Sequence, residues 1–129
     1  MKTAIISVFD KTNIVQLASY LLENDFLILS SGGTYEYLNR HIYSERIVTI
    51  ESYTGFPEIL RGRVKTLHPK IAAGILATDK QSDLEDLNNH GIYKIDLVVC
   101  NLYPFKEIIS KSHSNDEAIE NIDIGGVTL

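Results

Sequence analysis

The sequence is poor in the features that mark several classes of protein. Cys100 is the only cysteine among 129 residues, so the chain cannot form an internal disulfide and lacks the cysteine spacing of a metal site. The longest apolar runs, such as residues 27–29 and 97–100, fall far short of the ~20 residues needed to cross a bilayer. These absences exclude a disulfide-rich secreted scaffold and predict that no segment spans a membrane.

Positive charge is also scarce. Twelve lysines and arginines stand against 17 aspartates and glutamates, and the resulting net charge of −5 argues against general binding to nucleic acid. The N-terminus carries one lysine and a short apolar stretch interrupted by Ser7, unlike a secretory signal peptide, so we expect a cytoplasmic protein. A chain of this length buries roughly two-thirds of its unfolded surface. We therefore expect one domain over residues 1–129 that needs no structural metal.

Residues 61–70 depart from this acidic background. The segment holds four of the twelve basic residues together with His68, and it contains no carboxylate. Gly62 and Pro69 indicate a loop rather than a helix interior. A solvated loop would explain the charge, but a basic loop on an acidic protein also concentrates positive potential where an anionic ligand could dock. The composition favours a local anion site that includes this segment.

The apolar pattern predicts an α/β fold. Short continuous runs rich in isoleucine and valine are typical of strands buried on both faces, and amphipathic helical spacing follows several of them. Their alternation predicts a parallel sheet with helices on both faces, in three layers. The strands are expected at residues 3–8, 26–29, 47–50, 71–77 and 95–100, and the helices at residues 14–22 with Thr12 as N-cap, 35–40, around Leu84 and Leu87 up to Gly91, 104–111 and 116–122.

Polar and glycine-rich segments follow three of the expected strands. Ligands of parallel sheets bind beyond the carboxyl ends of the strands, so these segments should share one rim. Residues 31–34 combine two glycines, whose N–H groups can turn into one space, with two hydroxyls and a following helix, which are the parts of a phosphate cradle. Lys11 would supply positive charge, and Asn101 and Tyr103 would join the rim. A purely structural turn and a solvated lysine remain the alternatives.

Five ordered segments carry a family resemblance. They are Ser31-Gly32-Gly33-Thr34, Tyr53-Thr54-Gly55-Phe56-Pro57-Glu58, Gly62-Arg63-Val64-Lys65-Thr66-Leu67-His68-Pro69, Asn101-Leu102-Tyr103-Pro104-Phe105 and Glu120-Asn121-Ile122-Asp123-Ile124-Gly125-Gly126. Together they closely resemble the N-terminal domain of the bifunctional purine-biosynthesis enzyme that acts as aminoimidazolecarboxamide ribonucleotide formyltransferase and inosine monophosphate (IMP) cyclohydrolase. The resemblance covers essentially the whole chain and implies a methylglyoxal-synthase-like α/β fold.

The resemblance also implies an activity and its residues. The IMP cyclohydrolase domain closes the formylated aminoimidazole carboxamide ribonucleotide (FAICAR) to IMP with loss of water, the last step of de novo purine biosynthesis, without a cofactor and in a homodimer. Asp123 would be the base, and Lys65 and Tyr103 would stabilise and protonate the departing oxygen. The implied substrate-binding residues are Asp10, Lys11, Ser31, Gly32, Gly33, Thr34, Arg63, Thr66, Asn101, Ile124 and Gly125.

The sequence departs from the family pattern in two places. Phe9 stands where the family usually has a serine, so a hydroxyl near the ligand is replaced by an aromatic ring. The family continues beyond the position of Leu129 into a helix that supplies another site lysine, and then into the transformylase domain, and we expect this chain to lack both. The alternative is therefore a non-catalytic module that binds a purine nucleotide or phosphate. Methylglyoxal synthase itself is disfavoured because no Gly-Asp-Gln-Gln-like motif is present.

Overall fold

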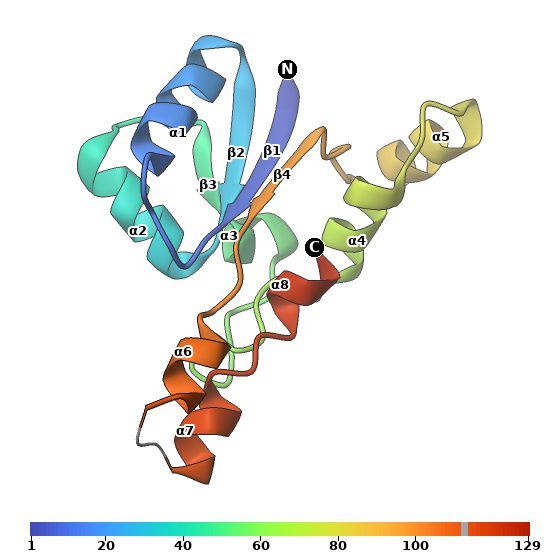
Figure 1. The fold of residues 1–129 in the computed structure, drawn as a ribbon. Helices are drawn as coiled ribbons and strands as arrows, with labels where there is room; N and C mark the ends of the chain where they lie inside the picture. The colour runs from blue at the N-terminus through green and yellow to red at the C-terminus, as the bar shows by residue number, and fades with distance from the viewer. Residues whose placement is uncertain (112–113) are drawn as a thin grey trace.

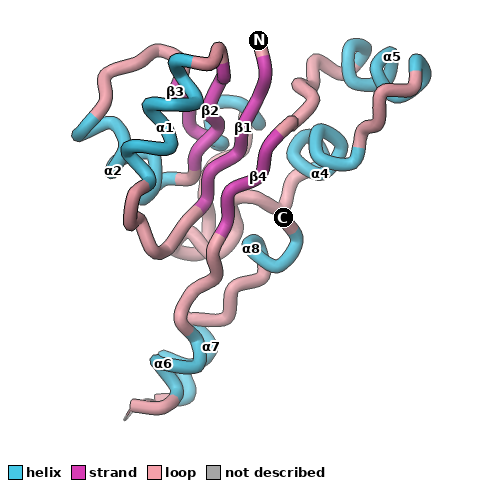
Figure 2. The backbone as a smooth tube through the Cα atoms, turned by 45° about the horizontal axis from the view of Figure 1, so that its top comes forward, coloured by secondary structure: helices cyan, strands magenta, loops and turns pink. Residues whose placement is uncertain are grey.

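A four-stranded parallel sheet forms the centre of the molecule (Figure 1). The computed structural model describes residues 1–111 and 114–129. Figure 2 shows the magenta strands side by side, with cyan helices on either side of them. This arrangement confirms the predicted α/β fold. In the spatial order β3-β2-β1-β4, the strands are β1 (Lys2–Ser7), β2 (Phe26–Ser30), β3 (Ile47–Thr49) and β4 (Leu97–Cys100).

Eight helices are present in the described part of the chain. α1 and α2 cover one face of the sheet, and α3 and α4 pack on the opposite face (Figure 1). α6 and α7 project from the body beyond the end of β4. No helix in the described ranges is both long enough and apolar enough to cross a membrane. The helices are α1 (Ile14–Glu23), α2 (Gly32–His41), α3 (Ile50–Thr54), α4 (Pro69–Leu76), α5 (Gln81–Asn89), α6 (Phe105–Ile109), α7 (Asn115–Glu120) and α8 (Gly125–Thr128).

The two covered faces of the central strand β1 explain why residues 4–6 are all apolar. Ala4 and Ile6 pack against α1 and α2, whereas Ile5 packs against α3 and α4 on the opposite face. All three side chains are fully buried. Successive residues of a strand point to opposite faces, so a strand covered on both sides needs apolar residues at every position rather than at alternate ones. The same buried core therefore holds the carboxyl ends of β1, β2 and β4 together at one rim.

The fifth predicted strand, at residues 71–77, is wrong. Residues 69–76 form helix α4, whose buried positions Ile71 and Gly74 are three residues apart, as one helical face requires. Pro69 occupies the first turn, where its missing N–H costs nothing. The His68 side chain caps the helix, since its Nδ1 accepts a hydrogen bond of 3.1 Å from the Lys70 N–H. The capping His68 and the proline at position 69 start a helix, although the short apolar run that follows them resembles a strand.

Several helix boundaries also differ from the predictions. Thr12 is not the N-cap of α1, because its N–H and its hydroxyl both donate to Asp10 Oδ1 and the cap position falls on Asn13. α2 begins at Gly32 instead of residue 35, so the two glycines form its first turn. Ile50 starts α3 instead of ending β3. The remaining ends shift by a few residues: β4 starts at Leu97, α6 spans Phe105–Ile109 and α7 spans Asn115–Glu120.

The Asn101 side chain joins the ends of β1 and β4. Its Oδ1 accepts hydrogen bonds from the N–H groups of Phe9 at 2.6 Å and Asp10 at 3.0 Å, and its Nδ2 donates to the Asp10 carbonyl at 2.9 Å. Replacing Asn101 by alanine is expected to lower the free energy of unfolding by about 1–2 kcal/mol, because three backbone groups lose a partner near the rim. Urea unfolding of the wild type and Asn101→Ala measures this difference. Asn101→Asp, which keeps the acceptor and loses the donor, should fall between them.

Candidate active site

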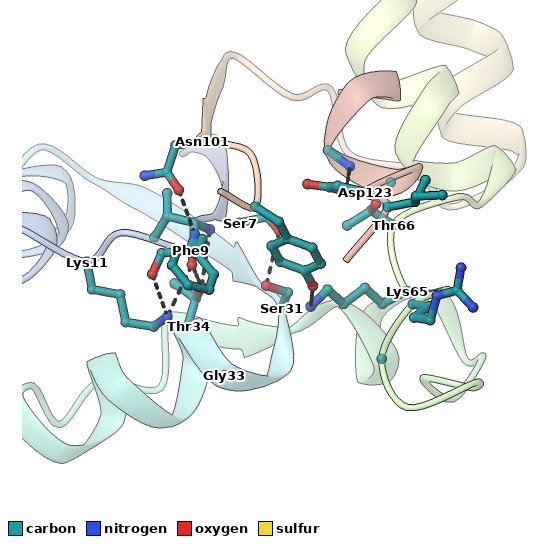
Figure 3. A pocket seen from close by; sticks show the side chains of 17 residues that line it. Ser7, Phe9, Lys11, Ser31, Gly33, Thr34, Lys65, Thr66, Asn101 and Asp123 are labelled. Carbon is teal, nitrogen blue, oxygen red and sulfur yellow. Dashed lines mark hydrogen bonds between the residues drawn. The ribbon is translucent and has the colours of Figure 1, made fainter. Parts of the chain in front are cut away.

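A pocket of about 290 Å³ lies beyond the carboxyl ends of β1 and β4 (Figure 3). Segments that are far apart in the sequence line it together, and Thr34, Arg63 and Tyr103 all face the same space. The basic loop thus lies against the strand ends. The lining residues are Ser7, Val8, Phe9 and Lys11 from β1 and its following turn, Ser31, Gly33 and Thr34 from the start of α2, Gly62, Arg63, Lys65 and Thr66 from the basic loop, Asn101 and Tyr103 after β4, and Ile122, Asp123, Gly125 and Gly126 near the C-terminus.

The start of α2 gives one end of the pocket two free hydrogen-bond donors. The first N–H groups of a helix have no partner within the helix, and the N-cap Ser31 makes no side-chain cap bond here. The Gly32 N–H donates to Glu58 Oε1 at 2.8 Å. The N–H groups of Gly33 and Thr34 have no partner among the described residues, and both residues line the pocket. Such a helix start suits a phosphate group.

The hydroxyls of the expected cradle are already used inside the protein. Thr34 Oγ1 donates to the Val8 carbonyl at 3.1 Å and accepts from the Val8 N–H at 3.3 Å, so it ties α2 to the end of β1. Ser31 Oγ lies 3.2 Å from Ser7 Oγ, and either hydroxyl can donate this hydrogen bond. The backbone N–H groups and the serine hydroxyl that does not donate, but not the threonine hydroxyl, are therefore the donors left for a ligand at this helix start.

Lys11 supplies positive charge beside the helix start (Figure 3). Its Nζ donates to the carbonyls of Val8 and Phe9, each at 3.2 Å, and these bonds fold the side chain back over the turn. Burial lowers the pKa of Lys11 below the ordinary lysine value of 10.5, and the positive charge of Lys65 lowers it further. The charge of Lys65 is thus close enough to act on Lys11, and an anion bound beside Lys11 would offset this repulsion.

Ligand binding should accordingly depend on the protonation of Lys11. Affinity for a phosphate-bearing ligand is expected to fall as the pH rises through the lowered pKa of Lys11, because the neutral amine no longer attracts a phosphate dianion. Calorimetric titration with a nucleoside monophosphate from about pH 7 up to the ordinary lysine value of 10.5 measures this dependence. Lys11→Ala should bind more weakly at neutral pH and lose most of the pH dependence, whereas Lys106→Ala, on the exposed helix α6, should behave as the wild type. A wild-type affinity that does not change over this range would contradict the assignment.

Lys65 and Tyr103 form a pair at the other end of the pocket. Lys65 Nζ donates to the Tyr103 hydroxyl at 3.3 Å and lies 5.9 Å from the centre of the tyrosine ring. The Phe9 ring packs edge-on against Tyr103, with ring centres 5.8 Å apart. Phe9 thus forms an aromatic wall beside this pair. The lysine and the tyrosine present two proton donors to one region of the pocket.

Asp123 faces the pocket from the turn that precedes α8 (Figure 3). Its Oδ1 accepts a hydrogen bond of 2.7 Å from the Gly126 N–H, which fixes the orientation of the carboxylate. No hydrogen-bond partner for Oδ2 is found among the described residues. Asp123 therefore combines a structural role through one oxygen with a second oxygen that can accept a proton.

Two buried polar atoms in the basic loop have no hydrogen-bond partner in the described part of the chain. They are Arg63 Nε and Thr66 Oγ1. Thr66 is only 4% exposed, and a Cβ atom on Gly125 would lie 2.5 Å from its Oγ1, so the glycine leaves just enough room for that hydroxyl. Arg63 is partly held, because its Nη2 donates to the Ile119 carbonyl at 3.1 Å. Buried donors are rarely left unpaired, so these two atoms mark unmet hydrogen-bonding capacity in the part of the basic loop that lines the pocket.

Three of the expected site residues lie outside the pocket lining. Asp10 is exposed, and hydrogen bonds from Thr12 hold the pKa of its carboxyl below the usual value. Gly32 gives its N–H to Glu58, and Ile124 is 43% exposed. The other expected site residues line the pocket: Lys11, Ser31, Gly33, Thr34, Arg63, Lys65, Thr66, Asn101, Tyr103, Asp123 and Gly125.

Five lining residues were not predicted from the sequence: Ser7, Val8, Gly62, Ile122 and Gly126. Phe9, at the position expected near the ligand, also lines the pocket. Ser7 carried a usable signal, since it is the polar residue that interrupts an otherwise apolar strand next to the rim. The others adjoin residues that were singled out, and only the folded chain shows which neighbour faces the pocket. In the described ranges, no group of three or more histidine, cysteine, aspartate or glutamate side chains is arranged to hold a metal ion.

Comparison with known proteins identifies the family. A family model described as the MGS-like domain matches residues 13–128. The chain belongs to the MGS-like domain family. This assignment confirms the methylglyoxal-synthase-like fold that the five sequence segments implied. Among solved structures, the crystal structure of ForH superposes with a TM-score of 0.78 at 35% identity, over 98% of this chain and 64% of that one.

Curated relatives of this MGS-like domain carry the name bifunctional purine biosynthesis protein PurH, in agreement with the resemblance inferred from the motifs. The protein from Prochlorococcus marinus strain NATL1A is 56% identical over 131 residues, which cover 98% of this chain. The one from Oenococcus oeni is 49% identical, and one from Clostridium botulinum is 48% identical, each over 100% of this chain. The chain spans about a quarter of their length, between 24% and 26%.

Proposed function

We propose that this MGS-like domain is the IMP cyclohydrolase of purine biosynthesis, closing FAICAR to IMP with loss of water. One observation carries the proposal: a single pocket holds free helix N–H groups and Lys11 at one end and Lys65, Tyr103 and Asp123 at the other. A ribonucleotide has the matching form, with a phosphate at one end and a heterocycle at the other. The curated relatives are named as bifunctional purine biosynthesis proteins, which supports a role for this domain in that pathway.

The phosphate would bind the Gly33 and Thr34 N–H groups, with Lys11 supplying the charge. The positive end of the helix dipole and two oriented N–H groups favour a dianion, and the lysine strengthens this interaction. Arg63 and Thr66 line the same pocket, and a small shift of the basic loop on binding would bring their buried, unpaired Nε and Oγ1 to the polar groups of the nucleotide. Binding at this end fixes the formyl and carboxamide groups at the opposite end, so that the reacting atoms are held close together.

Ring closure then requires the removal of one proton and the stabilisation of one oxygen. The carboxamide nitrogen attacks the formyl carbon, and Asp123 Oδ2 accepts the proton that the nitrogen loses. Lys65 Nζ and the Tyr103 hydroxyl donate to the former carbonyl oxygen as negative charge develops on it. The carbon–oxygen bond then breaks while the formamido nitrogen loses its proton and forms the C=N bond of the new ring. The oxygen leaves as water, carrying the two protons that the two nitrogens have given up, which reach it through the same donors.

A specific observation favours a second candidate, a module that binds a purine nucleotide without turnover. Asp123 already has a structural task in its bond to the Gly126 N–H, and a turn-closing aspartate needs no catalytic role. Such a module would use the phosphate end of the pocket in the same way. It would differ only in what happens to the bound heterocycle.

Turnover of FAICAR separates the two candidates. The purified chain should form IMP above the spontaneous rate of ring closure, followed by the change in ultraviolet absorbance and by chromatography of the product. Binding of IMP by calorimetry without any acceleration would support the binding module instead. Light scattering on the same sample tests the homodimer that the family resemblance implies, which we include in the proposal.

A further inference from the structure

The Tyr53–Glu58 segment contributes a carboxylate to the start of α2. Glu58 Oε1 accepts the Gly32 N–H at 2.8 Å, although Glu58 does not line the pocket. The fit is close, because a Cβ on Gly32 would lie 2.8 Å from Oε1 and 3.0 Å from Oε2. A Cβ on Gly62 would lie 3.4 Å from Oε2. The carboxylate is therefore packed between two glycines, one from the helix and one from the basic loop.

Glu58 immediately precedes the hairpin that carries the basic residues. The N–H of Ile59 donates to the Val64 carbonyl at 3.1 Å, and the N–H of Val64 donates back to the Ile59 carbonyl at 3.3 Å. Between them, Leu60, Arg61 and Gly62 all have positive φ angles, of 53°, 59° and 76°. Left-handed backbone is unfavourable for leucine and arginine, so surrounding contacts must hold this turn in place.

We propose that Glu58 is a positioning residue that fixes the basic hairpin to the phosphate-binding start of α2. This inference rests on the proposed function, since the hairpin leads directly into Lys65 and Thr66. Through Glu58, the same helix start that offers the Gly33 and Thr34 N–H groups to a ligand also sets the position of Arg63 and Lys65. The carboxylate uses the one N–H of that turn that does not face the pocket.

If the Glu58 carboxylate instead competed with the phosphate, its removal would change the affinity for the ligand in the opposite direction. A competitor would occupy the ligand's own donors, and its removal would strengthen binding. Glu58 instead bonds Gly32, which lies outside the lining, and leaves the two lining N–H groups unpaired. Its removal should thus weaken binding by loosening the hairpin, even though a negative charge is removed from the vicinity of an anion.

The test compares Glu58→Ala, Glu58→Gln and the control Glu36→Ala, which removes an exposed carboxylate from the same helix. Glu58→Ala is expected to bind IMP about tenfold more weakly, the loss typical of one hydrogen bond to a charged group. Glu58→Gln keeps an oxygen acceptor for the Gly32 N–H and should recover most of the affinity. A merely destabilising effect would not be rescued in this way, and thermal unfolding of each variant measures that effect separately.

Hydrogen exchange decides the proposal without any ligand. In Glu58→Ala the amides of Ile59 and Val64 should exchange at least tenfold faster than in the wild type, while those of β1 stay protected. Gly32→Ala, whose methyl group would displace the carboxylate, should accelerate the same two amides. Unchanged exchange in both variants, or tighter IMP binding by Glu58→Ala, would overturn the positioning role. A wild type with intact hairpin protection that neither binds nor converts nucleotide would overturn the proposed function instead.

Discussion

Replacing Asp123 by asparagine is expected to slow FAICAR closure by roughly 10²–10⁴-fold, the usual contribution of a general base. Asparagine has the same shape, and its side-chain oxygen can still accept the Gly126 N–H that Asp123 Oδ1 now accepts at 2.7 Å. The turn before α8 should therefore remain in place. What is lost is the second oxygen's capacity to take a proton, so kcat should fall while affinity for IMP changes little.

The matched control is Asp86→Asn, at an exposed position of α5 that does not line the pocket. Single-turnover kinetics of the wild type and both variants, with FAICAR in excess over its dissociation constant, measure the chemical step directly. Asp86→Asn should match the wild type. If Asp123→Asn turned over at the wild-type rate, Asp123 would have only the structural role, and the proton would have to be accepted by another group.

The buried strands were predictable because their physical signal is local. β1 and β2 lie at the centre of the sheet, and a strand covered on both faces must be apolar at consecutive positions. Residues 71–77 carried a similar apolar run and misled the prediction. The deciding features lay just upstream, in the proline at the first helical position and the capping imidazole of His68. Apolar content alone does not separate a buried helix from a strand over so few residues.

The site was predictable as a set of residues but not as a set of contacts. Motif order and the rule for strand ends indicated that Lys11, residues 31–34 and Tyr103 share one rim. Neither the motif order nor the rule for strand ends shows which hydrogen-bond donors remain free for a ligand. Thr34 lies where it was expected, but its hydroxyl is hydrogen-bonded to the backbone of Val8. Backbone N–H groups supply free donors instead. Contacts between residues 26 positions apart depend on the folded backbone, which no local pattern records.

Replacing Lys65 by alanine is expected to lower kcat by roughly 10²–10³-fold, comparable to the loss of one oxyanion donor. Lys65 Nζ lies within hydrogen-bond distance of the Tyr103 hydroxyl, at 3.3 Å, so the two donors should act as a unit. Tyr103→Phe alone should cause a smaller loss, since the lysine remains. Residues in direct contact do not contribute additively, and the double variant should therefore lose less than the product of the two single losses. Multiplicative losses would contradict a coupled pair.

Lys65→Ala should also change the titration of Lys11. The charge of Lys65 is the second cause of the lowered pKa of Lys11, after burial. Without that charge the pKa of Lys11 should rise toward, but not reach, the ordinary value of 10.5, because burial persists. IMP binding by Lys65→Ala should consequently weaken at a higher pH than in the wild type, even though the variant has lost a positive charge in the pocket. Calorimetry over the same pH range measures this shift, and an unmoved or lowered midpoint would show that the charge of Lys65 does not act on Lys11.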